Sequence, residues 1–510
     1  MAQNQAMDAA LLTLAEMGEA DRLTIAAGTP GIVLMERAAE AIAETVLARY
    51  PGAERVACLA GPGNNGGDAY AAAAILLRAG REVRLFHLVP PEKLQGDAAN
   101  AAAAYDGPAE PLAAFDAQSF DLVIDGLFGA GLARPLEGEV AELVERLNAA
   151  ATPVVAIDLP SGISGASGAV LGTAVEAEAT VTFFRRKPGH LLEPGRSHCG
   201  AVAVSDIGVL STALETIAPK CFENRPALWR HRLAVPSDAG HKYDRGHAVV
   251  FSGPASRTGA ARLAATAALR AGAGLVTMFS PAGAVLVNAA HLTAVMLKRC
   301  EDTDELASHL GDTRLNAFVL GPGFGAGETA RAYAEAVLAA GGRLVLDADG
   351  ISSFKDDPEA LFAAARAASE ARGDSEPALV LTPHSGEFKR LFPDIASAEG
   401  LSKLDQARLA AERACAVVVL KGRDTVIAAP DGRAAINATG TPWLATAGSG
   451  DVLSGIVAAQ LAQGTPSFEA AAAAVWMHGK AAEAFGAGLI AEDLPGMLPK
   501  VFAGLEATGP

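Results

Sequence analysis

Short apolar runs alternate along most of the chain with longer segments whose apolar positions recur every three or four residues. The short runs are typical of buried β-strands, and the longer segments are typical of amphipathic helices. Alternation of the two along a chain indicates a mostly parallel sheet with helices on both faces. The pattern therefore predicts an α/β fold.

The first half opens with helical periodicity over residues 11–50, which the Gly28-Thr29-Pro30-Gly31 turn divides into two segments. Two further helices are predicted, an alanine-rich one that ends near Arg78 and one over Glu137–Leu147. The predicted strands of this half are Val56–Ala60, Val83–Val89, Leu122–Asp125, Val154–Ile157, Ala179–Phe184 and Val202–Ile207.

The regularity fails from about residue 208 to 239, where several prolines and the charged run Arg230–Arg232 suggest a linker. We predict an N-terminal domain over residues 1–215, a linker over 216–235 and a C-terminal domain over 236–510. The clearest helices of the second domain are Gly259–Ala271 and Ala470–Ala487. Its predicted strands are His247–Ser252, Gly274–Phe279, Ala317–Leu320, Leu344–Leu346, Ala378–Leu381, Ala416–Leu420 and Thr425–Ala428.

Composition narrows the class of partner. A chain of 510 residues is too long for one ordinary core, which agrees with two domains. Its 58 acidic residues outnumber 41 basic ones, which argues against nucleic acid or an anionic membrane as the main partner. The five cysteines are scattered without a CxxC pair, and no signal peptide or apolar run of about 18 residues is present. These features predict a cytoplasmic protein that acts on small molecules.

The loop Gly61-Pro62-Gly63-Asn64-Asn65-Gly66 satisfies the GxGxxG pattern of dinucleotide-binding folds. That pattern requires an acid at the end of the second strand to bind a ribose, but this strand ends Leu88-Val89-Pro90. Pro62 also removes one backbone N–H. The loop is therefore interpreted as an oxygen-rich site at a strand end rather than as a dinucleotide fingerprint.

Oxygen-bearing side chains follow three predicted strands of the first domain. Asn64, Asn65 and Asp68 follow the first strand, Asp125 ends the third, and Asp158 and Ser161 follow the fourth. The carboxyl ends of parallel strands converge on one crevice, where ligands bind. Such oxygens suit a hard cation or a polar ligand, although Asp and Asn also start ordinary turns. Lys187 follows the fifth strand and is either a cation of this site or a solvated surface lysine.

The second domain contains the stretch Ala445-Thr446-Ala447-Gly448-Ser449-Gly450-Asp451, directly before an apolar helical pattern. A glycine-rich turn that runs into a helix leaves backbone N–H groups free to bind a phosphate. Asp451 would then be either a base that removes a hydroxyl proton during phosphoryl transfer or a helix cap, and the stretch alone does not distinguish these. No Walker A or protein-kinase motif is present, and no His/Cys metal motif. His384 follows another predicted strand, where a functional and a structural role are equally expected.

The whole chain resembles the bacterial bifunctional NAD(P)H-hydrate repair enzymes, in which an NAD(P)HX epimerase is fused to an ADP-dependent NAD(P)HX dehydratase. In the first half the resemblance rests on Leu34–Ala38, Gly61–Asp68, Asp125–Gly131, Asp158–Gly162 and Lys187–Gly189. In the second half it rests on Gly259–Ala261, Gly321–Gly323, Thr382–Glu387, Lys421-Gly422, Thr425 and Gly448–Asp451. It implies a Rossmann-like three-layer sandwich followed by a ribokinase-like α/β domain.

The resemblance also implies roles for individual residues. In the epimerase the hydrated dinucleotide would be bound by Asn64, Asn65, Gly66, Gly67, Asp68, Gly129, Ala130, Gly131, Leu132, Ala133, Arg134, Pro135 and Asp158, with Asp158 and Lys187 moving protons. A potassium ion would be bound by Asn65, Asp125 and Ser161. In the dehydratase the substrate would contact Ala260, Gly323, His384 and the catalytic Asp451. The nucleotide would be bound by Lys421, Gly422, Arg423, Asp424, Thr425 and Gly450, with ADP as phosphoryl donor and magnesium as an optional companion.

Several positions depart from the family pattern: Ala38 and Ala69 stand where glycine is usual, Ala130 replaces a threonine, and Ser449 stands where threonine is common. Each keeps a small residue, but Ala130 removes a hydroxyl from the epimerase loop. Two other functions remain open on the residues alone. The second half could be a sugar or hydroxymethylpyrimidine-type kinase, or the first half could be a nucleotide sensor without catalysis. We also expect a homo-oligomer, whose size the sequence does not determine.

Overall fold

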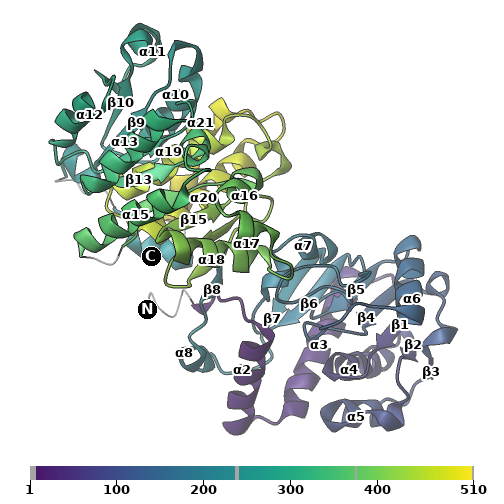
Figure 1. Cartoon of the computed structure of the whole chain (residues 1–510). Helices are drawn as coiled ribbons and strands as arrows, with labels where there is room; N and C mark the ends of the chain where they lie inside the picture. Colours follow the sequence, from purple (N-terminus) through teal and green to yellow (C-terminus); the bar gives the residue numbers. More distant parts are fainter. Residues whose placement is uncertain (1–6, 236–239, 374–375, 508–510) are drawn as a thin grey trace. The chain divides into compact units, whose positions relative to one another are not determined.

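The computed structural model describes residues 7–235, 240–373 and 376–507. Within these residues the chain forms two compact units, one over Ala10–Cys221 and one that combines the chain from Phe222 onward with residues 7–9 (Figure 1). The change of unit falls inside the stretch 216–235. This stretch is ordered, since it carries β8 (Cys221–Glu223) and α9 (Pro226–Trp229) with Trp229 fully buried. The predicted start of the second domain at residue 236 lies outside the described residues.

The first unit is built on a parallel sheet with the strand order β3-β2-β1-β4-β5-β6-β7. The order reverses between β1 and β4, which creates the crevice where ligands bind in such sheets. All the strands predicted for this half are present, with small shifts at their ends. The strands are β1 (Arg55–Ala60), β2 (Glu82–His87), β3 (Ala109–Pro111), β4 (Leu122–Gly126), β5 (Val154–Ile157), β6 (Ala179–Phe183) and β7 (Ala201–Ser205).

Helices cover both faces of this sheet, as the alternating pattern predicts. Right-handed crossovers that leave the switch point in opposite directions place their helices on opposite faces. The helix α4 accordingly packs on β1, β2 and β4, while α6 packs through Leu143, Val144 and Leu147 on the other face. The helices are α2 (Leu14–Ala26), α3 (Gly31–Arg49), α4 (Asn64–Arg78), α5 (Gly96–Ala103), α6 (Gly138–Ala149), α7 (Gly195–His198) and α8 (Ala213–Ile217).

The second unit is built on a larger sheet, whose described strands have the order β11-β10-β9-β12-β13-β14-β15-β16-β17-β8. Strands β9 to β15 run parallel, and β16 and β17 form an antiparallel extension. Its reversal lies between β9 and β12. The strands are β9 (His247–Phe251), β10 (Leu275–Ser280), β11 (Met296–Arg299), β12 (Ala317–Leu320), β13 (Arg343–Leu346), β14 (Leu379–Leu381), β15 (Val417–Leu420), β16 (Val426–Ala428) and β17 (Ala434–Ile436).

Four strands escape the sequence pattern because they are short or lie at sheet edges. Residues of β3 and β11 are mostly exposed or half-buried, so they lack an apolar run. The other two, β8 and β17, have three residues each and lie beside each other at the far edge of the second sheet. The two-domain α/β prediction is nevertheless confirmed.

The helix α19 (Ser449–Ala462) lies at the centre of the second unit. It packs against β9, β12 and β13 and is flanked by α10 (Thr258–Arg270) and α20 (Ser467–Phe485). Residues Val452–Ala462 are buried throughout, whereas the sequence pattern predicts one apolar face. A Cβ at Gly455 would lie 2.1 Å from the carbonyl oxygen of Ala264, so only glycine permits this close helix packing.

The remaining helices of the second unit surround this core (Figure 1). In the part of the chain that the structure describes, none of the helices is both long and apolar enough to cross a membrane. These helices are α11 (Val285–His291), α12 (Thr303–Leu310), α13 (Glu328–Ala339), α14 (Ala348–Ser352), α15 (Pro358–Arg372), α16 (Ser385–Leu391), α17 (Pro393–Ser397), α18 (Lys403–Ala414) and α21 (Leu494–Ala507).

Candidate functional site

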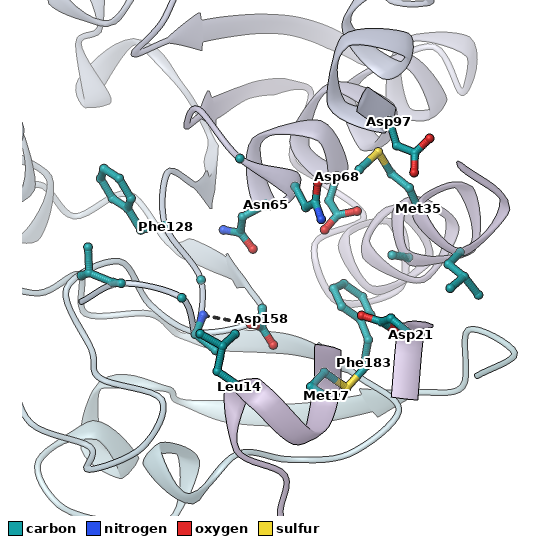
Figure 2. Close-up of a pocket in the computed structure, with 18 of the residues that line it drawn as sticks. Leu14, Met17, Asp21, Met35, Asn65, Asp68, Asp97, Phe128, Asp158 and Phe183 are labelled. Carbon is teal, nitrogen blue, oxygen red and sulfur yellow. Dashed lines mark hydrogen bonds between the residues drawn. The ribbon is translucent and has the colours of Figure 1, made fainter. Parts of the chain in front are cut away.

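A pocket of about 700 Å³ opens in the first unit at the reversal between β1 and β4 (Figure 2). Side chains from α2 and α3 line one side, and the loops after β1, β4 and β5 line the other. The residues predicted from strand ends that line it are Asn64, Asn65, Asp68, Gly129, Ala130, Gly131, Leu132, Ala133, Arg134, Asp158 and Lys187. Other predicted residues do not line it: Gly66, Gly67, Pro135, Asp125 and Ser161.

Asp158 and Lys187 form an ion pair in this pocket, with Lys187 Nζ 2.6 Å from Asp158 Oδ1. Thr182 Oγ1 donates a hydrogen bond to the same carboxylate oxygen, and the backbone N–H of Ala130 donates to Oδ2 at 3.0 Å. Burial by itself would raise the pKa of Asp158, but the charge and hydrogen bond of the Lys187 ammonium, with the hydrogen bond from Ala130, outweigh it and hold the pKa below its usual range. Asp158 is therefore ionised, and its three hydrogen bonds fix the orientation of the carboxylate.

The backbone around this pair is fixed by His190. Its Nδ1 accepts the N–H of Lys187 at 2.9 Å, and its Nε2 lies 2.7 Å from the carbonyl oxygen of Asp158. The ring is therefore neutral with its proton on Nε2, which agrees with a pKa lowered to about 4 by burial and by the Lys187 charge. Asp158 itself adopts a left-handed backbone conformation with φ 63°, which costs energy and is common at functional sites.

Asp125 and Ser161 lie together directly beside this pocket. Ser161 donates from Oγ at 2.7 Å to Asp125 Oδ1 and from its backbone N–H at 2.8 Å to Oδ2. Asp125 is fully buried, and burial raises its pKa despite these hydrogen bonds. The third member of the predicted cation site, Asn65, has a buried Nδ2 without a hydrogen-bond partner in the described structure.

Three more carboxylates line the pocket, those of Asp21, Asp68 and Asp97, and Figure 2 shows that they come from helices while Asp158 comes from a loop. Asp68, from α4, has a pKa well above its usual range because of burial, Asp158 and Asp21. Asp21, from α2, has a pKa raised to about 6 by burial, against the opposing effect of Lys187. The sequence did not indicate Asp21, because an acid on an amphipathic helix has the pattern of a solvated surface residue.

Glycines set the close spacing in this site. A Cβ at Gly129 would lie 2.8 Å from Asn65 Oδ1 and 3.0 Å from Asp158 Oδ2. A Cβ at Gly66 would lie 2.0 Å from the carbonyl oxygen of Gly61. Gly66 therefore permits the sharp entry into α4 rather than lining the pocket.

In the second unit, the predicted Gly-rich turn leads directly into α19. Gly448 has φ 90°, a left-handed conformation that favours glycine, and Asp451 lies in the first turn. Burial raises the pKa of Asp451 to about 6; the Asp347 carboxylate adds to this effect and the Lys421 ammonium opposes it. The N-cap residue of this helix is Gly448, so Asp451 lies within the first turn and does not occupy the N-cap position.

Lys421 lies against the same turn. Its Nζ would be 3.4 Å from a Cβ at Gly450, and it pairs with Asp347 Oδ1 at 2.9 Å. Asp347 ends up here because it follows β13, whose carboxyl end meets those of β14 and β15. The structure thus brings the predicted Lys421, Gly450 and Asp451 together and adds Asp347, which the sequence did not indicate. The sequence does contain a signal for Asp347, because it is an acid at the end of a predicted strand, as Asp125 and Asp158 are.

The other predicted residues of this half lie in neighbouring loops. Gly323 has φ 65°, and a Cβ there would be 3.3 Å from Ala260 Cβ, so these two residues adjoin. His384 caps α16, since its Nδ1 accepts the backbone N–H of Gly386 at 2.9 Å, while its side chain is 54% exposed. His384 therefore has a structural role and remains accessible.

The Lys421–Thr425 loop is ordered by two contacts. Lys403 Nζ binds Asp424 Oδ1 at 2.5 Å, and Thr425 Oγ1 donates to the carbonyl of Gly422 at 2.9 Å.

Comparison with known proteins adds a second line of observation. Residues 248–500 match the family model described as NAD(P)H-hydrate dehydratase, and residues 31–189 match the model described as YjeF-related protein N-terminus. The chain is 36% identical to the bifunctional NAD(P)H-hydrate repair enzyme of Moorella thermoacetica, over 97% of both chains. It is 37% identical to that of Gloeobacter violaceus, over 96% of this chain and 97% of the other.

Among solved structures, the chain is similar to the ADP/ATP-dependent NAD(P)H-hydrate dehydratase from Bacillus subtilis co-crystallized with ATP/Mg²⁺. The identity is 27% and the TM-score 0.45, over 55% of this chain and 97% of that one.

Proposed function

The chain belongs to the family of bifunctional NAD(P)H-hydrate repair enzymes, and we propose how its two units divide that work. The first unit interconverts the R and S hydrates of NADH and NADPH. The second dehydrates the S hydrate back to the reduced nucleotide at the expense of ADP. The observation that carries this function is the match over nearly the full length of both chains to relatives of that name.

Epimerisation occurs around Asp158. Inverting the ring carbon that carries the hydroxyl requires a bond at that carbon to break and re-form on the opposite face, and a proton to be taken up and returned. The ionised Asp158 takes the hydroxyl proton as the ring C–N bond at that carbon breaks, which sends the electron pair to the ring nitrogen and leaves a carbonyl. Asp158 returns the proton when the bond re-forms on the opposite face. Lys187, 2.6 Å away, stabilises the ionised carboxylate before and after this exchange. Because the proton returns to the substrate, the enzyme is unchanged after each turnover.

The hydrated dinucleotide is bound by the amide and carboxyl groups of Asn64, Asn65 and Asp68 and by the loop from Gly129 to Pro135. This loop offers the guanidinium of Arg134 to the phosphates, which suits bidentate binding. The site carries four acidic side chains, Asp21, Asp68, Asp97 and Asp158, against two cations, so we expect Asp68 to bind substrate in its protonated form, as its raised pKa supports.

Potassium fits the cluster of Asn65, Asp125 and Ser161. All three supply hard oxygen ligands, which an alkali cation prefers. The described partners of the buried Asp125 carboxylate are uncharged, namely Ser161 and the backbone N–H of Leu127, so a cation would supply the missing countercharge. Bound there, the ion would order the loops after β4 and β5. Epimer exchange should fall when potassium is replaced by tetramethylammonium and recover when potassium returns; equal rates would remove the ion from the proposal.

Dehydration occurs around Asp451. Asp451 takes the proton of the ring hydroxyl as its oxygen attacks the terminal phosphorus of ADP, which releases AMP. The phosphate of the resulting ester is a good leaving group. Its loss from the ring, together with a proton from the neighbouring ring carbon, restores the reduced nicotinamide. Backbone N–H groups of Gly448–Gly450 stabilise the charge on the transferred group, and Lys421–Thr425 bind the nucleotide, with magnesium as its companion. Ala260, Gly323 and His384 contact the hydrated ring.

The small-molecule kinase and the nucleotide sensor considered above are not supported, because both halves match the repair family. The cytoplasmic location and the homo-oligomer remain predictions. The free state of all described cysteines supports the first, and light scattering on the purified protein tests the second.

The decisive experiment supplies a mixture of both NADHX epimers to the full chain, with ADP, with ATP or with neither. NADH absorbance is followed while chromatography resolves the epimers. Conversion of both epimers only with nucleotide would support both activities. Conversion of one epimer alone would contradict the epimerase role, and no recovery at all would contradict the dehydratase role.

A further inference from the structure

We propose that Asp347 is a positioning residue of the dehydratase site: it holds Lys421 and the first turn of α19 and so prevents Lys421 from pairing with Asp451. The proposal rests on the proposed role of Asp451 as the base. Nothing in the sequence pattern or the family resemblance assigns a role to Asp347.

Asp347 is placed by a tightly built turn. It follows β13, is 2% exposed, and accepts the backbone N–H of Ala348 at 2.9 Å. Ala348 has φ 46°, a left-handed conformation that is unfavourable for a residue with a Cβ. A Cβ at Gly321 would lie 1.8 Å from the carbonyl oxygen of Asp347. This turn therefore contains a strained backbone conformation and packs against a position that only glycine can occupy. Strain of this kind is common where a functional group must be oriented.

The two carboxylate oxygens of Asp347 have different partners. Oδ1 accepts the ammonium of Lys421 at 2.9 Å, and Oδ2 accepts the hydroxyl of Ser454 at 2.7 Å. Ser454 lies one turn after Gly450 in α19, and its Oγ is also 3.0 Å from the carbonyl oxygen of Gly450. One buried side chain therefore connects the loop after β15 to the helix turn that carries Asp451.

This arrangement controls which acid pairs with Lys421, the cation that acts on Asp451; the neighbouring Lys403 is paired with Asp424. Asp451 is influenced by Asp347 and Asp349 from the turn after β13 and by Lys421 from the loop after β15. His478, on α20, bonds to the backbone of Ser449 and is held neutral, with a pKa lowered to about 4 by burial. With Asp347 present, Lys421 binds Asp347, and Asp451 keeps the raised pKa that a base working near neutrality needs. Without Asp347, the ammonium is free to pair with Asp451 and to weaken it as a base.

The test compares Asp347→Asn with wild type in the full chain. The rate of ADP-dependent dehydration of the S hydrate is measured from about pH 5 to pH 8, together with KM for ADP. We expect kcat to fall at least about tenfold and the midpoint of the acidic limb to move to lower pH. Unchanged kcat and an unchanged midpoint in a folded variant would overturn the proposal, and so would a defect confined to KM for ADP.

Three further variants control the experiment. Ser454→Ala removes one hydrogen bond but no charge, so we expect a smaller fall in kcat without a shift of the midpoint; a shift equal to that of Asp347→Asn would contradict the charge argument. Asp347→Asn combined with Lys421→Gln removes both charges of this ion pair, so neither partner is left buried without the other and the variant should fold even if the single variant does not. Its midpoint should lie above that of Asp347→Asn; a midpoint at or below it would overturn the proposal.

Glu469→Gln breaks a comparable ion pair, Arg433–Glu469 at 2.7 Å, outside the site. It should keep wild-type kcat; a loss equal to that of Asp347→Asn would attribute the effect to stability and overturn the proposal. Failure of the proposed function itself is recognised separately, because wild type would then show no ADP-dependent dehydration.

Discussion

Lys187 Nζ lies 2.6 Å from Asp158 Oδ1, and both side chains are largely removed from solvent, with 4% and 16% exposure. A buried ion pair of this kind contributes little net stability, because desolvation offsets the Coulomb attraction. Breaking it by removing one partner is costly, since the other charge is left buried. The pair is therefore better explained by its effect on Asp158, which it keeps ionised inside a pocket.

Lys187→Met should test that explanation. Without the ammonium, burial raises the pKa of Asp158, so epimer exchange near neutral pH should fall at least about tenfold. Unfolding in urea at pH 7 should show a loss of about 3–5 kcal/mol in stability, which shrinks at acid pH as Asp158 protonates. Dehydration of purified S hydrate serves as the control and should persist. Full epimerisation by this variant would remove Lys187 from the mechanism.

Gly129→Ala should impair the same site by steric means. The added Cβ would meet Asn65 Oδ1 at 2.8 Å and Asp158 Oδ2 at 3.0 Å, so one of these groups must move. Displacement of reacting groups by about an ångström commonly costs on the order of 100-fold in rate. Gly52→Ala is the matched control, because nothing lies within 4 Å of its Cβ position. Equal epimerisation rates in the two variants would contradict the geometry described here.

The ionisation of Asp21 should make the unfolding free energy depend on pH. Its folded-state pKa of about 6 lies above the ordinary aspartate pKa of 3.8, so its ionisation opposes folding. The penalty is absent below about pH 4 and complete above about pH 7. Asp21→Asn should therefore raise the unfolding free energy at pH 8 by roughly 1–2 kcal/mol and leave it unchanged near pH 4.

We also expect Asp21→Asn to slow epimer exchange, because a destabilising carboxylate in a pocket is typical of a functional group. The measurements are thermal or urea unfolding at both pH values and the exchange rate. If the variant is less stable than wild type at pH 8, the folded environment stabilises the ionised Asp21, which contradicts the raised pKa.

Asp451→Asn should abolish dehydration and leave epimerisation intact. The base must be ionised, so wild-type dehydration should rise through about pH 6, the raised pKa of Asp451, and level off above it. The two activities are measured separately, by NADH recovery with ADP and by epimer exchange without nucleotide. Normal dehydration by this variant would exclude Asp451 as the base.

Much of the site follows from local sequence. Asp125 and Asp158 are predicted because acids at the ends of parallel strands converge at one crevice. Asp158 lines the pocket there, and the buried Asp125 lies directly beside it. Asp347 follows a predicted strand as well, but its Asp-Ala-Asp-Gly context is equally that of an ordinary turn. Asp21 is not predicted for a different reason: helical periodicity indicates which face is apolar, not which acid of the polar face lines a pocket.

The sequence by itself determined most of the elements, because strand and helix periodicities reflect neighbours along the chain, and it determined which loops bear oxygen-rich or glycine-rich groups. Only the tertiary structure decided which charges meet. Lys187 pairs with Asp158 across 29 positions and Lys421 with Asp347 across 74, since the order of strands in each sheet brings these loops together. The pKa values follow from those pairings and from burial, and both depend on packing rather than on local sequence.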